Sequence, residues 1–362
     1  MKTNSYKVLM NGSLFAASNS ANGFKSYYDE IFNRKEYRRR YLIKGGPGTG
    51  KSRLMRCVAE AAKQNGASVQ CYSCSSDPDS LDAVIIGEKI VLLDSTAPHV
   101  CECDRAGARD ELIDLGVFWD SRKLSERFDE IDALFRKKAS LYAKAYRYLS
   151  ACGEVAKINA GMVLDALRHE KMRNAVSRLL ADLPCGEEFS MIPALNDSIG
   201  MKGRVRFDTY EKSAEKLYIV IDHASSAHYY LSLVIIEAQR KKLAIRVSFD
   251  PILPEYPNSV YFCNSGLAFV AVSDTEAGEL SGSRVNMKRF VDNGLFSEIK
   301  SEYRYNNKLY SALLASAADS LSEAGESHFE LEKIYSSCMD FDAKEKYTVS
   351  FAELVISQLK NL

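Results

Sequence analysis

The sequence predicts an α/β protein of two homologous halves, each a mostly parallel sheet flanked by helices and extended by a helical hairpin. Two observations lead to this fold class. A glycine-rich motif lies between a short apolar run and an amphipathic run, and a segment of the second half follows the same pattern. The chain has 362 residues, of which 46% are hydrophobic, so it is long enough for more than one core.

The strongest local signal is YLIKGGPGTGKSRL, residues 41–54. Gly45, four further residues and Gly50-Lys51-Ser52 complete the G-x-x-x-x-G-K-[ST] pattern of a phosphate-binding loop, or P-loop. Residues 40–43 are predicted to form a buried strand, and residues 53–64 have the i, i+3, i+4 spacing of a helix packed on a sheet. The motif therefore has the strand–loop–helix context of a P-loop NTPase.

Each residue type in this loop suits a phosphate. Glycines permit positive φ and leave no Cβ in the way, so backbone N–H groups can point at the anion, as does the positive end of the following helix. We expect Lys51 to bind the β- and γ-phosphates and the Ser52 hydroxyl to bind Mg²⁺. The predicted cofactor-binding residues are Gly45, Gly46, Pro47, Gly48, Thr49, Gly50, Lys51, Ser52 and Arg53.

A magnesium site also needs a carboxylate at the end of a neighbouring buried strand. The run KIVLLDS, residues 89–95, supplies apolar residues followed by Asp94, which is the Walker B pattern. We therefore predict that Asp94 is the second magnesium ligand and acts with Lys51 in catalysis.

Further polar residues follow the predicted strands. In an open parallel sheet the carboxyl ends of the strands lie at the same edge as the phosphate loop. This geometry is expected to bring several side chains near the γ-phosphate: Asp77, Asp79, Asp82, Asp94, Thr96 and His99. Asp77 and Asp79 either orient a water and accept a proton or serve only as turn residues. His99 either senses the γ-phosphate or substrate or makes a structural hydrogen bond.

The expected cofactors are ATP and Mg²⁺. The Asn-Lys-x-Asp pattern of guanine specificity is missing, because Asn307-Lys308 is followed by Leu309 and Tyr310. No Glu follows Asp94, so the usual water-activating carboxylate of fast ATPases is not visible in the sequence. We expect slow hydrolysis, or transfer of the phosphoryl group to an acceptor other than water.

The second half repeats the first. YIVIDHASSAHYYL, residues 218–231, aligns without a gap with residues 41–54, and Asp250-Pro251 aligns with Asp77-Pro78. A later apolar run, FVAVSDT, aligns with IVLLDST of the first half. A tandem duplication explains these matches with one event.

The phosphate-binding chemistry is lost in the second copy. Asp222, Ala227, His228 and Tyr229 stand where the motif has its first glycine, last glycine, lysine and serine. An Asp repels phosphate, and a Tyr is too large for the position of a hydroxyl that binds Mg²⁺. We therefore expect a pseudo-site that gives structural or regulatory support, in which His223 and His228 are either leftover polar residues or recruited to a metal or catalytic role.

The predicted domains are residues 1–184, with a helical hairpin at about 123–183, and residues 185–362, with a hairpin at about 296–362. These helical stretches lack sustained a/d heptads, so a simple coiled coil is not expected. They are candidates for contacting a protein partner in response to nucleotide, although a plain packing role is equally consistent with the pattern.

Composition limits the partners and the compartment. Forty-eight basic residues balance forty-eight acidic ones, so we expect neither nucleic acid nor membrane as a partner. No apolar run reaches the length of a spanning helix, and nine cysteines, an odd number, favour a reducing compartment. A cytoplasmic location is expected.

Several segments together resemble an uncharacterised bacterial family of ATPases that is built from two P-loop halves. They are LFAASNSANGFKSYYDEIF, KGGPGTGKS, CSSDPDSLDAVII, LLDSTAPHV and LIDLGVFWD. The resemblance covers nearly the whole first half and the layout of the second. It implies two nucleotide sites, and this chain departs from it by lacking the second Gly-Lys-Ser.

Three functions are compatible with these features. The first is a slow, Mg²⁺-dependent ATPase with one competent site in the N-terminal half. The second is a kinase that transfers the γ-phosphate of ATP to a small molecule, with Asp77 or Asp79 as the base. The third is an ATP-responsive protein-interaction module that does not hydrolyse the nucleotide.

Overall fold

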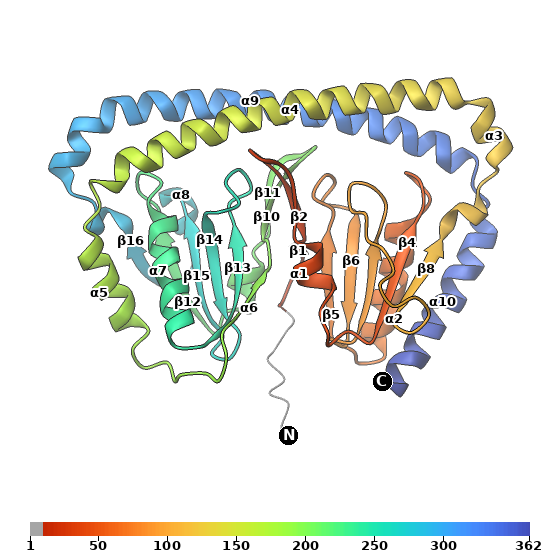
Figure 1. The fold of residues 1–362 in the computed structure, drawn as a ribbon, viewed down its shortest axis with the longest axis horizontal. Coiled ribbons are helices and arrows are strands. Elements are labelled where there is room, and N and C mark those ends of the chain that lie inside the picture. The colour runs from red at the N-terminus through yellow and green to blue at the C-terminus, as the bar shows by residue number, and fades with distance from the viewer. Residues whose placement is uncertain (1–9) are drawn as a thin grey trace.

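The computed structural model describes residues 10–362 as two α/β halves under a pair of long helices (Figure 1). The elements of the first half are β1 (Leu14–Phe15), β2 (Ala17–Ser20), β3 (Gly23–Ser26), α1 (Tyr28–Phe32), β4 (Arg39–Lys44), α2 (Lys51–Gln64), β5 (Val69–Ser73), β6 (Leu81–Ile86), β7 (Ile90–Asp94), β8 (Asp110–Asp114), the 3₁₀ helix η1 (Leu115–Phe118), α3 (Ser121–Glu126), α4 (Phe128–Leu164) and α5 (His169–Leu179).

The second half begins with β9 and repeats this order almost element by element. Its elements are β9 (Ser190–Pro193), β10 (Asp197–Gly200), β11 (Gly203–Arg206), α6 (Thr209–Ser213), β12 (Lys216–Ile221), α7 (Ala227–Arg240), β13 (Ala244–Phe249), β14 (Pro257–Phe262), β15 (Leu267–Val272), α8 (Asp274–Ala277), β16 (Ser283–Asn286), the 3₁₀ helix η2 (Met287–Phe290), α9 (Asn293–Ser337) and α10 (Phe341–Asn361).

The two six-stranded sheets have the same topology. The first has the strand order β1-β5-β6-β7-β4-β8, and the second has the order β9-β13-β14-β15-β12-β16. Strands at matching positions also match in chain order, so β4 of the first half, next to the edge strand β8, corresponds to β12 of the second. The prediction of two similar α/β halves is confirmed.

Each sheet is mixed but mostly parallel, as predicted: five of its six strands run in one direction, and β6 or its counterpart β14 runs against them. β4 pairs in parallel with β7 and with β8, whereas β6 is antiparallel to both β5 and β7. The sequence prediction missed β6 as a separate strand. Gly87 and Glu88 both have positive φ, 56° and 59°, which allows the tight hairpin whose three loop residues, 87–89, join β6 to β7. This reversal places the start of β6 at the same edge as the ends of β5 and β7.

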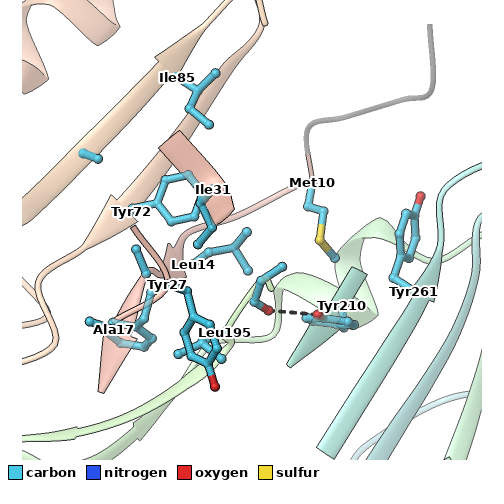
Figure 2. Packing of buried hydrophobic residues seen from close by; sticks show 14 of the residues in the cluster. Met10, Leu14, Ala17, Tyr27, Ile31, Tyr72, Ile85, Leu195, Tyr210 and Tyr261 are labelled. Atoms are coloured by element: carbon cyan, nitrogen blue, oxygen red, sulfur yellow. Dashed lines mark hydrogen bonds between the residues drawn. The ribbon is translucent and has the colours of Figure 1, made fainter. Parts of the chain in front are cut away.

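A shared core joins the two halves. Figure 2 shows Leu14 and Tyr72 of the first half close to Leu195 and Tyr210 of the second half. The backbone N–H of Phe15 donates to the carbonyl of Leu195 at 2.7 Å, which links the halves directly. The halves therefore bury apolar surface against each other rather than standing as separate domains.

The two longest helices, α4 and α9, extend from one half to the other and lie over both (Figure 1). α4 and α9 contact each other along their lengths, α5 packs on α7 of the second half, and α10 packs on α2 of the first half. The expected hairpin within each half is therefore wrong. With 37 and 45 residues and no proline, α4 and α9 span about 55 and 67 Å without a turn at which the chain can reverse.

Two helical glycines let these helices approach the sheet domains. A Cβ on Gly153 of α4 would lie 2.4 Å from Cβ of Ala21, in the turn of the β2–β3 hairpin. A Cβ on Gly325 of α9 would lie 2.8 Å from Cβ of Met201, in the turn of the β10–β11 hairpin. The two contacts are counterparts in the two halves. None of the helices within residues 10–362 has the length and apolar character needed to cross a membrane.

Replacing Phe351 of α10 by Ala tests whether this C-terminal helix packs on the first half of the chain. Phe351 is 3% exposed, and its ring lies 4.9 Å from the Tyr41 ring of β4. The truncation is expected to lower the free energy of unfolding by about 3–5 kcal/mol, measured by urea denaturation. Phe341→Ala, at the start of the same helix where the side chain is 44% exposed, is the matched control and should cost less than about 1 kcal/mol. Equal effects of the two changes would contradict this packing.

Candidate functional site

The P-loop sequence lies between β4 and α2, at the carboxyl edge of the first sheet. Gly48 and Gly50 have φ values of 67° and 84°, a region that side chains with a Cβ rarely adopt. The Lys51 ammonium donates to the carbonyl oxygens of Gly45 and Gly46, both at 2.9 Å. The lysine therefore folds back over the loop, and its hydrogen-bond partners there are backbone carbonyls.

Asp94 lies beside this lysine. It ends β7 and is paired in register with Ile43 of β4. Its Oδ2 is 3.6 Å from Lys51 Nζ, and its Oδ1 accepts from the backbone N–H of Thr96 at 2.8 Å. Thr96 Oγ1 also donates to the Gly45 carbonyl at 3.2 Å. The end of β7 and the start of the loop are thus tied together around a cation and a carboxylate.

The other loop residues have varied environments. Ser52 Oγ accepts from the backbone N–H of Leu81 at 3.0 Å, so its hydroxyl faces the start of β6. Thr49 is buried and donates to the Gly46 carbonyl at 2.9 Å, and Pro47 is partly buried. Arg53 is exposed and pairs with a carboxylate of α10 at 2.8 Å. Arg53 therefore points toward α10, where its partner is Glu345.

Asp77 and Asp79 lie in the loop between β5 and β6. Asp77 accepts from the Ser80 hydroxyl at 2.9 Å and from the backbone N–H of Asp79 at 3.3 Å. Asp79 also forms an ion pair with Lys202, in the β10–β11 turn of the second half. In this structure the two acids stabilise a turn and link the two halves.

His99 forms a buried pair with Asp82 at the start of β6. His99 Nε2 is 3.2 Å from Asp82 Oδ2, and the imidazole stacks on the Tyr28 ring with centroids 4.7 Å apart. Burial raises the pKa of Asp82, and His99 opposes that shift. Burial, followed by the nearby charges of Asp82 and Asp94, raises the pKa of Tyr28. A buried polar cluster therefore adjoins the Asp94 carboxylate.

Residues of α9 cover the loop, and sequence analysis did not find them. Ser336 Oγ donates to the Gly48 carbonyl at 3.1 Å, and a Cβ on Gly46 would lie 2.7 Å from the Tyr335 ring. The pKa of Glu332 is lowered by a hydrogen bond from His328, by the Lys51 charge and by the backbone N–H of Gly48. The Glu332 carboxylate thus lies among the groups that the motif assigns to phosphate.

Two further lysines, Lys344 of α10 and Lys138 of α4, lie near the loop. A Cβ on Gly50 would lie 2.9 Å from Nζ of Lys344, which is buried and has no hydrogen-bond partner in the described part of the chain. Burial lowers the pKa of Lys344. The pKa of Lys138, on α4, is lowered by burial and also by the charge of Lys51. No sequence signal identified these residues, because their helices were assigned to hairpins elsewhere.

The corresponding loop in the second half is organised around a carboxylate. Asp222 accepts from the backbone N–H groups of Ala227 at 2.8 Å and Ser225 at 3.1 Å, at the N-terminus of α7. The backbone donors that would receive a phosphate are thus used by the protein's own side chain. The His228 ring stacks on Tyr256 with centroids 4.0 Å apart, and Ser273 caps α8.

No cluster of His, Cys, Asp and Glu suited to a metal ion occurs among residues 10–362. The two histidines of the second loop have separate aromatic neighbours: His223 lies 5.2 Å from the Phe296 ring, and His228 contacts Tyr229 and Tyr256. Among the predicted site residues, the structure brings together Lys51 with Asp94 and His99 with Asp82.

His228→Gln is expected to reduce the acid sensitivity of folding. Burial lowers the pKa of His228 from 6.5 to about 4, so the unfolded chain binds a proton between these pH values while the native protein does not. Stability is therefore complete above pH 6.5 and falls as the pH drops toward 4, by up to about 3 kcal/mol from this residue. Urea denaturation at several pH values measures the difference.

The matched control for this experiment is His169→Gln, at an exposed position at the start of α5. It should leave the pH dependence of the wild type unchanged. If His228→Gln lost as much stability as the wild type between pH 6.5 and 4, the buried neutral imidazole would not be the cause.

No family model, no curated protein and no solved structure matches this chain.

Proposed function

We propose that the protein binds Mg-ATP in its first half and hydrolyses it slowly. One observation carries this proposal: Lys51 lies beside Asp94 at the joined ends of two parallel strands, with a glycine loop and a helix N-terminus at the same point. Cation, carboxylate and aligned backbone donors are the groups that hold a magnesium-bound triphosphate.

The residues present fit the ligand. Within residues 10–362 the Lys51 ammonium contacts two backbone carbonyls and one carboxylate, and it would leave these partners to bind the β- and γ-phosphates. Ser52 and Asp94 would hold Mg²⁺, because a hydroxyl and a carboxylate are the oxygen ligands this hard cation accepts. The metal supplies charge neutralisation on the phosphate oxygens. The protein's own groups orient the chain of phosphates and neutralise the rest of its charge.

Slow turnover follows from the residue after Asp94. Ser95 is buried, and its hydroxyl donates to the Cys101 carbonyl at 2.6 Å, so this position supplies no carboxylate to activate water. Asp77 and Asp79 remain weaker candidates for a base, because turn and ion-pair contacts occupy them. His99 is engaged with Asp82 and is more suited to position groups near Asp94 than to accept a proton from water.

A second candidate function is a nucleotide-responsive module. It is favoured by the contacts of α9 with the loop, where Glu332 lies among the Lys51 and Gly48 groups and Ser336 binds the Gly48 carbonyl. The phosphates of ATP carry the same sign of charge as Glu332, so binding would repel this part of α9. Movement of a continuous helix would transmit nucleotide occupancy to the second half.

Lys51→Ala is expected to weaken ATP binding by at least about 100-fold, the equivalent of about 3 kcal/mol for charge-assisted hydrogen bonds. Titration calorimetry with Mg-ATP measures the affinity, and phosphate release measures turnover. The wild type should bind one ATP per chain and release phosphate slowly only when Mg²⁺ is present.

Two control variants accompany Lys51→Ala. Lys63→Ala removes an exposed lysine from the same helix, and His228→Ala changes the corresponding residue of the second half. Both should bind ATP as the wild type does. Two ATP molecules per wild-type chain would overturn the assignment of a single competent site, and unchanged binding in Lys51→Ala would overturn the nucleotide proposal itself.

Glu332→Gln tests the responsive module. The neutral side chain no longer competes with phosphate for Lys51 and Gly48, so the dissociation constant for Mg-ATP should fall by about three- to tenfold. Glu330→Gln, on an exposed face of the same helix, should leave it unchanged. Equal or weaker ATP binding in Glu332→Gln would show that this carboxylate does not oppose the nucleotide.

A further inference from the structure

A cavity of about 590 Å³ lies in the second half, at the place that corresponds to the P-loop site. Its floor includes Asp222 and His228 of the altered loop and Ser273 at the end of β15. Its roof includes Asn159 of α4 and Tyr310 of α9. The second half has therefore kept a space at the carboxyl edge of its sheet, where α/β proteins bind ligands, and its volume suits a small molecule.

Three buried hydrogen-bond acceptors at this cavity lack a partner within residues 10–362. They are Oδ1 of Asp197, Nε2 of His228 and Oδ1 of Asn258. Asp197 is 1% exposed. An unsatisfied buried polar atom costs about 1–3 kcal/mol, so three at one cavity are unusual unless something donates to them.

His228 acts as an acceptor in this set. Burial keeps its pKa near 4, so the imidazole is neutral at ordinary pH. The ring is hydrogen-bonded to the backbone of Ser225, an interaction that raises the pKa and therefore uses a ring N–H. The other nitrogen, Nε2, carries a lone pair and no proton. The cavity thus offers oxygen and nitrogen lone pairs to a ligand that donates.

The two arginines at the cavity, Arg204 and Arg206, form ion pairs with carboxylates of the protein. Arg204 Nε donates to Asp197 Oδ2 at 2.9 Å, and Arg204 Nη2 lies 3.3 Å from Asp250 Oδ2. Arg206 forms an ion pair with Glu211. Neither guanidinium is therefore free to hold a phosphate.

Carboxylates outnumber cations around the cavity. Asp197, Asp222, Asp250 and Glu276 line it, against Arg204 and Arg206. This balance repels an anion and attracts a cation. The acids do not gather into a group able to hold a metal ion within the described residues. An organic cation with N–H groups would balance the negative charge of the cavity and donate hydrogen bonds to the unpartnered acceptors.

We propose that this cavity binds a small protonated amine. Its ammonium group donates to the Asp197 carboxylate and to the neighbouring acceptors, and the Tyr256 and Tyr310 rings that line the cavity pack against its carbon chain and its charge. This proposal does not rest on nucleotide binding by the first half.

The test is titration calorimetry of the full chain with putrescine and with spermidine. Both should bind saturably, with one site per chain and a dissociation constant of about 1 mM or below. 1,4-Butanediol, which has the same carbon chain as putrescine without its charge, and inorganic phosphate should not bind. Absence of saturable binding of both amines up to about 10 mM, or binding of phosphate in place of amine, would overturn the proposal.

Two independent variants locate the binding. Asp197→Asn keeps the shape of the side chain and removes its charge, and Ala271→Leu fills the cavity from β15 without changing a polar group. Each should weaken amine binding by at least about tenfold, the equivalent of about 1.4 kcal/mol. A thermal unfolding curve for each variant verifies that it is folded. If Ala271→Leu, once folded, binds amine as the wild type does, the amine binds elsewhere and the proposal fails.

Control variants separate this site from charge in general and from the nucleotide site. Asp182→Asn removes an exposed carboxylate and should bind amine as the wild type does, so a loss there as large as in Asp197→Asn would overturn the assignment. Lys51→Ala should also bind amine normally. Loss of ATP binding with retained amine binding, or the reverse, distinguishes a failure of one proposal from a failure of the other.

Discussion

The antiparallel pairing of α4 and α9 is the constraint on which the rest of the architecture depends. Because each helix is continuous from one half to the other, the element that follows it must pack on the opposite sheet domain. α10 therefore covers α2, and α5 covers α7. Each loop helix buries its apolar face against a segment that the other half supplies, so neither half is complete without its partner.

The same two helices cover both carboxyl edges, and the side chains they present there differ. Over the first loop, α9 supplies Glu332, which accepts from the backbone N–H of Gly48 and is influenced by the Lys51 charge, and Ser336, which donates to the Gly48 carbonyl. Over the second, α4 and α9 leave a cavity beneath Asn159 and Tyr310. One edge is covered by the protein's own polar contacts, and the other keeps a cavity of about 590 Å³. A shift of either helix would change the surroundings of both sheet edges.

The loops themselves explain why the chemistry diverged while the scaffold did not. β4 and β12 occupy the same position in matching sheets, and α2 and α7 have the same length of 14 residues. Asp222 accepts hydrogen bonds at the N-terminus of α7, so a carboxylate of the chain itself occupies the backbone donors there. The fold tolerates this change because negative charge is favourable at the N-terminus of a helix.

Local sequence determined the glycine-rich loop, its flanking strand and helix, and the repeat, because these depend on neighbouring residues and on spacing within one half. It did not reveal β6 as a separate antiparallel strand, although the three residues between β6 and β7 are too few for the crossover that a parallel pair requires. Only the tertiary structure decided that α5 packs on the second half and α10 on the first, and which side chains surround each site. Ser336 and Gly48, for example, are 288 residues apart and meet because a continuous helix carries one to the other.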